Sequence, residues 1–375
     1  MDVDGKNLRI RKLIFRLFLF LSISSSWTFA ENSQPLRSVD LTRDLCKITQ
    51  IEVNTPEVGV EFISENEVLA YTVCQGTGEP TFSVRDHFQA SDSEHLKAAI
   101  FNVSTGKVEH HYDWPTHGDR SFITVTKKGN LLVVRDNFLD TYDLSGNQVA
   151  HLKIEKVYFQ DPLLMVPSYA TGSIAVTEIA MTVKKVLLTA TLVLDADTLH
   201  PLFKWNAKNE PEDRVIAASP EMAAAWQEVK DEKHVVIRTP KDAEWNTVWT
   251  GKSSSMIGPQ FLDASKFVIA TDDAILFFNH SGEVENQINV KAPTLFIVAR
   301  DGQHLAVAHP EDSPSAAFAP ATRLDVYGPS WQRIATFTNF NNLKRFFSVA
   351  LSPSGNKLAI LGDMQVTVFG ITQPQ

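Results

Sequence analysis

The chain has 375 residues, of which 43% are hydrophobic and 10% aromatic, and it carries a formal net charge of −9. This composition can supply a large buried core and excludes a disordered chain. The acidic balance argues against nucleic acid as a partner, because an acidic surface gains nothing from the counterion release that drives such binding.

The first thirty residues have the order of a secretory signal peptide. Five basic side chains precede the apolar run 17–23, and Thr28-Phe29-Ala30 places small residues where a signal peptidase reads. A permanent membrane anchor is the alternative, but a spanning helix needs about 20 apolar residues and this run is much shorter. We therefore expect cleavage near Ala30 and a secreted or periplasmic protein with no stable membrane span. The mature chain would hold 30 basic and 42 acidic side chains, a net charge of −12.

The rest of the chain consists of short alternating or apolar runs bounded by turn residues, a pattern that indicates an all-β protein. The runs form a larger unit of an apolar strand, a polar turn, a strand rich in small and β-branched residues, a third strand, and an outer strand. Seven openings of this unit lie at 62–71, 123–134, 169–177, 217–226, 261–270, 297–307 and 349–361. Copies are on the order of 40–50 residues apart, which is the period of a four-stranded propeller blade.

The second half of the unit also repeats. The segments Phe101–Gly106, Tyr142–Gly146 and Phe278–Gly282 each end a strand in Asn or Asp and place Gly a few residues later. The short polar side chain can bond the backbone two residues on, and Gly supplies the positive φ of a tight hairpin. These segments predict the turns between third and outer strands.

One segment carries a family resemblance. Residues 352–359, with the sequence Ser-Pro-Ser-Gly-Asn-Lys-Leu-Ala, are similar to the recurring Ser-Pro-Asp-Gly-Lys-x-Leu-Ala turn of the WD-repeat-like and YVTN-type propellers. The resemblance covers 41–371 as a pattern, although only this copy is similar in amino-acid sequence. The Gly-His and Trp-Asp dipeptides of ordinary WD repeats are missing. It implies an all-β β-propeller of about seven four-stranded blades. That group includes scaffolds, ligand binders and enzymes, so the resemblance assigns no chemistry.

The two ends of the repeat array suggest how the ring closes. The last unit stops after Gln365–Ile371 with three strands, and Leu45–Val53 is a strand without a unit of its own. Pairing the two would remove the exposed sheet edges. We therefore predict that Leu45–Val53 is the outer strand of the last blade. The chain then divides into a signal peptide (1–30), an N-terminal lead-in (31–44), one propeller domain (45–371) and a C-terminal tail (372–375).

The blade pattern also predicts on which face each loop and each cysteine lies. Second-to-third connections and connections between blades share one face, the top face, and the remaining turns share the bottom face. Cys46 would begin its strand near the bottom face, whereas Cys74 would end a second strand near the top face. A strand rises about 3.3 Å per residue, so the two would be farther apart than the ~7 Å limit for a bridge. We therefore expect two free or buried thiols, although an exported protein can form disulfides.

Long connections gather on the predicted top face. The insertions 75–97 and 310–322 join second to third strands, and 113–120 and 155–166 join neighbouring blades. Loops concentrated on one face of a rigid scaffold are the usual location of a binding surface, and tolerated insertions without a role are the alternative. The candidate binding-surface residues are Arg85, Asp86, His87, Phe88, Trp114, His117, Asp119, Glu311, Asp312 and Phe318.

The sequence offers no catalytic constellation. It has neither a Gly-x-Ser-x-Gly nor a His-Glu-x-x-His motif. His110, His111, His117 and Asp119 are metal-ligand types, but alternation along a strand sends His110 and His111 to opposite faces, so a solvated blade edge is the preferred interpretation. No catalytic, metal or cofactor residue is assigned.

Three functional hypotheses remain. The first is an exported, non-catalytic interaction module that meets a protein or small ligand through its top-face loops. The alternative is an exported propeller hydrolase or lactonase-like enzyme with a divalent metal held in the central channel by carboxylates from several blades. A third possibility is a subunit of a larger envelope or redox complex. The absence of motifs favours a protein that is not an enzyme.

Overall fold

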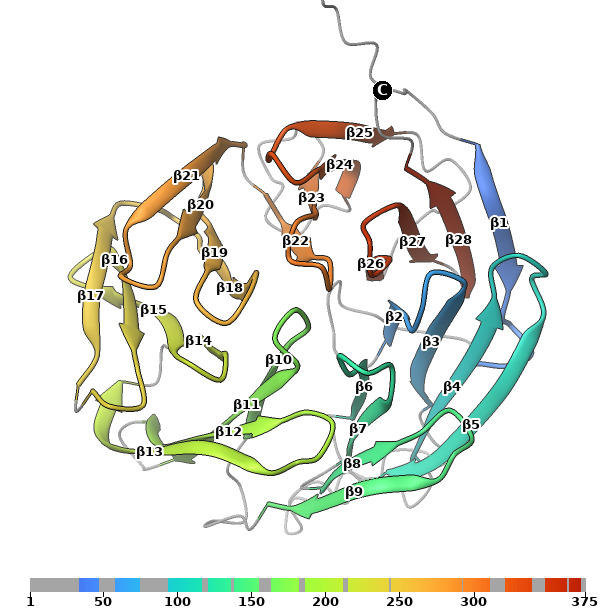
Figure 1. The fold of residues 1–375 in the computed structure, drawn as a ribbon, viewed down its shortest axis with the longest axis horizontal. Helices are drawn as coiled ribbons and strands as arrows, with labels where there is room; N and C mark the ends of the chain where they lie inside the picture. Colours follow the sequence, from blue (N-terminus) through green and yellow to red (C-terminus); the bar gives the residue numbers. More distant parts are fainter. Residues whose placement is uncertain are drawn as a thin grey trace, which may run out of the picture.

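The computed structural model describes residues 34–46, 58–74, 94–116, 121–135, 138–154, 163–181, 186–211, 215–242, 244–291, 293–310, 321–338, 348–362 and 364–371. Within these ranges the strands form seven four-stranded antiparallel sheets, which stand around a central channel as the blades of a β-propeller (Figure 1). The predicted all-β fold with seven four-stranded blades is confirmed. No helix in the described ranges is long and apolar enough to cross a membrane.

Each blade is an antiparallel meander that runs from the channel outward. Blade 1 consists of β2 (Val58–Phe62), β3 (Glu67–Cys74), β4 (Glu94–Asn102) and β5 (Val108–Thr116). Blade 2 consists of β6 (Phe122–Val125), β7 (Leu131–Arg135), β8 (Phe138–Tyr142) and β9 (Gln148–Lys153). Blade 3 consists of β10 (Leu163–Ser168), β11 (Ser173–Met181), β12 (Val186–Asp195) and β13 (Pro201–Pro211).

The other blades repeat this order. Blade 4 consists of β14 (Val215–Ala218), β15 (Ala223–Val229), β16 (Glu232–Arg238) and β17 (Asn246–Gly251). Blade 5 consists of β18 (Ile257–Phe261), β19 (Phe267–Ala270), β20 (Ala274–Phe278) and β21 (Val284–Asn289). Blade 6 consists of β22 (Leu295–Val298), β23 (Leu305–Pro310), β24 (Ala321–Tyr327) and β25 (Arg333–Thr338). Blade 7 consists of β26 (Ser348–Leu351), β27 (Lys357–Gly362), β28 (Gln365–Gly370) and, as its outer strand, β1 (Pro35–Asp40).

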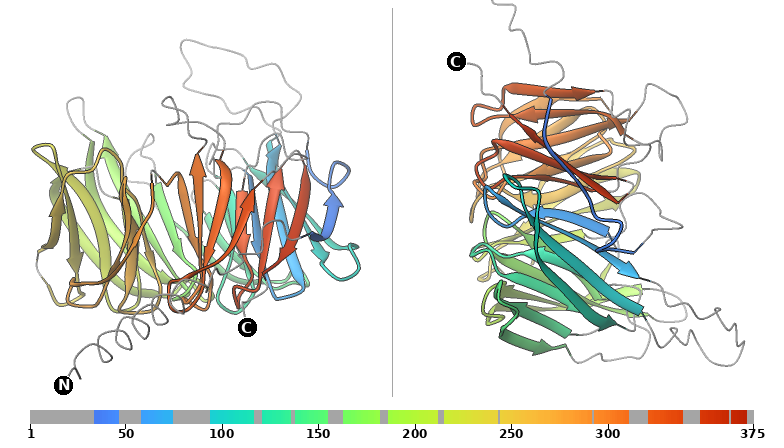
Figure 2. Two further views of the ribbon diagram at one scale, coloured as in Figure 1. Left: turned by 90° about the horizontal axis from the view of Figure 1, so that it is seen from above. Right: turned by 90° about the vertical axis from the view of Figure 1, so that its right-hand side faces the viewer.

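The apolar core lies between the blades. Each sheet is covered on both faces by its neighbours, so the second strands are buried on both sides and read as apolar runs. Val268 and Phe277 of blade 5, for example, pack against Phe296 and Val307 of blade 6. The strands cross the thickness of the disc, as Figure 2 shows. The first strand of each blade is the inner edge strand of its sheet. Within the described ranges, the backbone edge that it turns toward the channel is not paired with another strand.

The ring is closed by an N-terminal strand, as expected, but by a different one. Strand β1 pairs with β28, with Val39 opposite Val366. The prediction that Leu45–Val53 forms this strand is wrong: Leu45 lies in the turn region after β1, and residues 47–53 are outside the described ranges. The closing strand is largely exposed and polar, because one of its faces meets solvent. It therefore lacks the apolar run from which the other strands were predicted. The propeller therefore begins at Pro35, within the predicted lead-in.

The expectation of two free thiols is also wrong. Cys46 and Cys74 form a disulfide, with their Cα atoms 5.6 Å apart. The error follows from the misplaced closing strand. Because β1 ends at Asp40, Cys46 comes after the end of an outer strand and not at its beginning, and it therefore lies at the same top face as the end of β3. The bond joins the segment after β1 to blade 1 across the closure seam.

Candidate functional site in the central channel

The predicted binding-surface residues are mostly outside the described ranges. Trp114 is the exception, and the other nine, Arg85, Asp86, His87, Phe88, His117, Asp119, Glu311, Asp312 and Phe318, stay a prediction. Trp114 is buried in β5, where its ring centroid lies 5.2 Å from that of Tyr112 and 5.5 Å from that of Tyr142 in blade 2. It packs in the seam between blades 1 and 2.

The neighbouring histidines behave as strand alternation requires. His110 stacks on Tyr112 with a centroid distance of 6.3 Å. His111 points to the other side, where its Nδ1 lies 3.5 Å from Oδ1 of Asp44. The two imidazoles therefore do not share one site.

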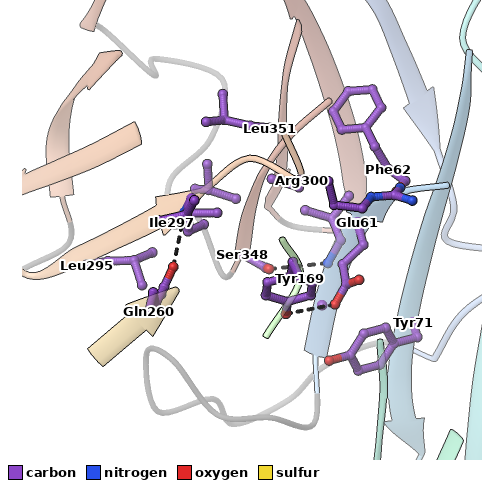
Figure 3. Close-up of a pocket in the computed structure, with 15 residues that line it drawn as sticks. Glu61, Phe62, Tyr71, Tyr169, Gln260, Leu295, Ile297, Arg300, Ser348 and Leu351 are labelled. Atoms are coloured by element: carbon purple, nitrogen blue, oxygen red, sulfur yellow. Dashed lines mark hydrogen bonds between the residues drawn. The ribbon is translucent and has the colours of Figure 1, made fainter. Parts of the chain in front are cut away.

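A cavity of about 230 Å³ occupies the central channel (Figure 3). The first strands of blades 1, 5, 6 and 7 form its walls, and side chains from a turn of blade 3 and from β3 complete it. Its walls combine aliphatic groups, such as Leu295 and Ile297, with polar ones. The polar lining side chains are Glu61, Tyr71, Tyr169, Gln260, Arg300 and Ser348. Sequence inspection did not single out any of these six residues.

Glu61 is the acidic member of this lining. Its Oε2 accepts a hydrogen bond from the backbone N–H of Val125 at 2.6 Å, and its Oε1 accepts one from the Tyr169 hydroxyl at 3.1 Å. Burial raises the pKa of Glu61 to about 7, although these two hydrogen bonds and the charge of Arg300 act in the opposite direction. Burial also raises the pKa values of Tyr71 and Tyr169, so both hydroxyls stay protonated. Glu61 is therefore the channel group whose charge changes near neutral pH.

Arg300 reaches across the bottom end of the channel. It follows β22 in blade 6, and its guanidinium donates hydrogen bonds to carbonyls in the turns of blades 1 and 2. Nη2 bonds Ile63 O at 2.9 Å and also Phe62 O, and Nη1 bonds Thr126 O at 3.3 Å. Because Tyr169 reaches Glu61 from blade 3, side chains of blades 1, 3 and 6 meet here. We call Glu61, Tyr169 and Arg300 the channel plug.

Polar side chains of the first strands bond the exposed backbone edge of the next blade. Gln260 of blade 5 accepts from Val298 N at 3.0 Å and donates to Phe296 O at 2.9 Å, both in blade 6. Glu61 does the same for blade 2 through Val125. A local signal could have found this pair, because both follow a glycine by two residues and precede a phenylalanine, in Gly59–Phe62 and Gly258–Phe261.

The metal-enzyme alternative needs carboxylates from several blades around the channel. Glu61 is the single Asp or Glu among the residues that line the cavity. In the part of the chain that the structure describes, no group of three or more His, Cys, Asp or Glu side chains could hold a metal ion. The described channel thus lacks the ligand set that this alternative requires.

The bottom-face turns bond one another. Ser354 N of blade 7 donates to Oε1 of Glu65 in blade 1 at 2.8 Å, and Ser219 Oγ of blade 4 donates to Ala264 O of blade 5 at 2.6 Å. Arg300 adds bonds from blade 6 to the turns of blades 1 and 2. At these positions the polar groups of the turns are bonded within the protein.

Seven four-stranded blades around a channel define a seven-bladed β-propeller. No protein-family model matches the chain, and no curated protein sequence does. Among solved structures, a chain of the mitotic checkpoint complex is similar at 13% identity and a TM-score of 0.54, covering 91% of this chain and 96% of that one. The C-terminal WD40 domain of Sif2 aligns at 12% identity and a TM-score of 0.48, over 92% of this chain and 99% of that one. The similarity to the chain of the mitotic checkpoint complex, at 13% identity, shows the fold alone.

Proposed function

We propose that the protein is an exported, non-catalytic interaction module that binds a protein or a small ligand at its top face. The observation that carries the proposal is the contrast between the two faces. Several bottom-face turns are bonded to the turn of a neighbouring blade, as Ser354 is to Glu65. The predicted insertions 75–97 and 310–322 are shorter than expected, because Glu94 already begins β4, Pro310 ends β23 and Ala321 begins β24. The remaining connections, 75–93 and 311–320, join second to third strands, whose linked ends lie at the top face. A rigid ring with its long loops on one face is suited to binding a partner.

The fold comparison supports the same class of role. WD40-like propellers include protein-interaction domains, and the propeller of the mitotic checkpoint complex is one chain of a multiprotein assembly. A single ring offers a broad and rigid platform, and its loops can change without loss of the scaffold.

Export is the second part of the proposal. The basic and apolar residues of 1–30 have the order of a signal peptide, and the Cys46–Cys74 disulfide fits an oxidising compartment. We place the mature protein in the periplasm or outside the cell. Mass spectrometry of the protein purified from its producing cells should find Glu31 as the first residue, whereas an intact N-terminus in the membrane fraction would contradict export in soluble form.

The partner hypothesis is tested by comparing the two faces. In one variant a short Gly-Ser linker replaces 78–90, in a second it replaces 312–319, and a bottom-face control carries His280→Ala and Lys128→Ala. Each protein is cross-linked in its native compartment, and the captured partners are identified by mass spectrometry. We expect the wild type and the control to capture the same partner and at least one top-face variant to lose it. A partner lost only by the bottom-face control would refute the proposal.

A further inference from the structure

A second cavity lies away from the channel, on the flank of blade 2. It has a volume of about 570 Å³. It lies between Pro115, in β5 of blade 1, and strands β8 and β9 of blade 2. Blades 1 and 2 are neighbours in the ring (Figure 1). This volume falls within the usual range for small-ligand sites. The channel plug does not contribute to it, and Pro115 is the one lining residue from a predicted loop, 113–120.

The polar side of this flank pocket is organised by Asp140. The Asp140 side chain is 2% exposed, and each of its oxygens is bonded by side chains that line the pocket. Oδ1 lies 2.7 Å from Nε2 of Gln148 and 2.6 Å from Nδ1 of His151, and Oδ2 accepts from Nη2 of Arg135 at 2.6 Å. The carboxylate thus holds an amide, an imidazole and a guanidinium in fixed orientations. Arg135 balances the Asp140 charge, and the Lys153 ammonium, 5.8 Å from the centroid of the Phe138 ring, adds a positive charge beside the pocket.

The other side of the pocket is aromatic. Alternation along β8 places Phe138, Asp140 and Tyr142 on one face of the strand, and all three line the pocket. Phe138 and Tyr142 are partly exposed, and the Phe138 ring stacks with the His151 ring at a centroid distance of 5.6 Å. Tyr142 is backed by Trp114. The ligand would meet aromatic surface and fixed hydrogen-bonding groups at the same time.

A structural explanation for the buried aspartate can be tested against blade 6. Asp325 occupies the position of Asp140: it lies in the third strand, opposite Val307 and Thr336, as Asp140 lies opposite Val133 and His151. Arg323 and Thr336 donate to Asp325 at 3.0 and 2.7 Å. The buried aspartate is therefore a feature that two blades share, and it can serve the fold.

The pocket-facing groups are what differ between the two blades. Phe138 of blade 2 corresponds to Arg323 of blade 6, because each precedes its aspartate by two residues, and His151 corresponds to Thr336. The shared aspartate needs donors but has no need of a partly exposed phenyl ring beside an imidazole. Blade 2 thus differs from blade 6 in the groups around its aspartate, and the Phe138 ring also has contacts within the blade, with His151 and with the Lys153 ammonium.

We propose that the flank pocket of blade 2 binds the ring of a neutral sugar. A sugar ring has an apolar C–H face that can lie on an aromatic ring and hydroxyl groups that both donate and accept hydrogen bonds. Phe138 and Tyr142 provide the aromatic surface. With Nδ1 of His151 held by Asp140, Nε2 is the ring nitrogen left toward solvent, and Gln148 and Arg135 add amide and guanidinium groups.

The proposal is tested by saturation-transfer NMR of the purified protein with four neutral disaccharides: maltose, cellobiose, lactose and diacetylchitobiose. We expect at least one of them to receive saturation. Phe138→Ala and His151→Ala should each weaken its Kd at least tenfold. Thr336→Ala, the matched change in blade 6, should leave the Kd unchanged.

Melting curves and the choice of a second variant separate loss of binding from loss of folding. Melting curves show whether each variant is folded, and His151→Ala, at a half-exposed side chain, tests the site even if Phe138→Ala does not fold. Saturation of none of the four disaccharides would overturn the proposal, as would a Kd that is the same in the wild type and in folded His151→Ala. The result does not depend on the top-face partner, because the capture experiment alters none of the pocket residues.

Discussion

Glu61 and Gln260 occupy equivalent positions in the first strands of blades 1 and 5, and each accepts a hydrogen bond from a backbone N–H of the following blade. The distances are 2.6 Å from Val125 N to Glu61 and 3.0 Å from Val298 N to Gln260. An amide can perform this role without any charge. The carboxylic acid at position 61 therefore adds an ionisable group that the inter-blade bond does not require, and this difference makes the stability of the ring depend on pH.

The first prediction concerns Glu61→Gln. The folded pKa of Glu61 is about 7 and its ordinary value 4.5, so the folded state holds this proton more tightly than the unfolded chain. The resulting stabilisation is complete below pH 4.5 and is lost as the pH rises through 7, by up to about 3 kcal/mol. Urea unfolding at pH 5 and pH 8 should show that Glu61→Gln lacks this loss.

Gln260→Glu is the matched control for that experiment. It removes the donor to Phe296 O, a bond of 2.9 Å, and adds a partly buried acid, so stability should fall more at pH 8 than at pH 5. Equal pH dependence of unfolding in the wild type and in Glu61→Gln would show that Glu61 does not titrate near 7.

The second prediction concerns the Cys46–Cys74 disulfide. The bond closes a loop with a sequence separation of 28, for which chain entropy predicts a stabilisation of about 3–4 kcal/mol. The double variant Cys46→Ser/Cys74→Ser should unfold at correspondingly lower denaturant concentration, and reductant should destabilise the wild type but not the variant. Thiol titration of the unfolded, unreduced protein should find no free thiol, and two thiols per chain would contradict the pairing.

The third prediction separates backbone strain from a steric clash. Gly302 and Gly129 both lie in bottom-face turns with positive φ, of 67° and 87°. A Cβ at 302 would lie 1.8 Å from Leu262 O, whereas at 129 its nearest neighbour would be 3.7 Å away. Gly129→Ala should cost about 1–2 kcal/mol, and Gly302→Ala distinctly more, because the backbone of the adjacent blade must move. Similar free energies of unfolding for the two variants would contradict this close approach.

The fourth prediction addresses metal removal. Because Glu61 is the single acidic side chain that lines the described channel cavity, we expect chelation to leave the melting temperature of residues 31–375 unchanged. Metal analysis of the purified protein is the companion measurement. A stoichiometric divalent ion, together with a melting temperature that falls on chelation and recovers when metal is returned, would support the metal-enzyme alternative.

The sequence could predict little of the channel plug. Glu61 leaves a weak local signal, because Gly59–Phe62 and Gly258–Phe261 share a pattern. Arg300 and Tyr169 leave none, since each meets its partners only when blades 6 and 3 are brought around the ring to blade 1. The flank pocket leaves a similarly weak signal, because Asp140 is the one charged residue of the short strand β8 and its register against His151 appears only in the folded sheet.

The sequence by itself predicted the all-β class, the four-stranded unit and a ring of about seven blades, and the structure has seven. Strand alternation and hairpin turns such as Tyr142–Gly146 are local, so they are visible in any one copy of the repeat. Only the tertiary structure decided that Pro35–Asp40 closes the ring and that Cys46 meets Cys74. The closing strand pairs with β28, at the far end of the chain, and no local pattern specifies such a partner. Its one solvent-exposed face also removed the apolar signal by which the other strands were recognised.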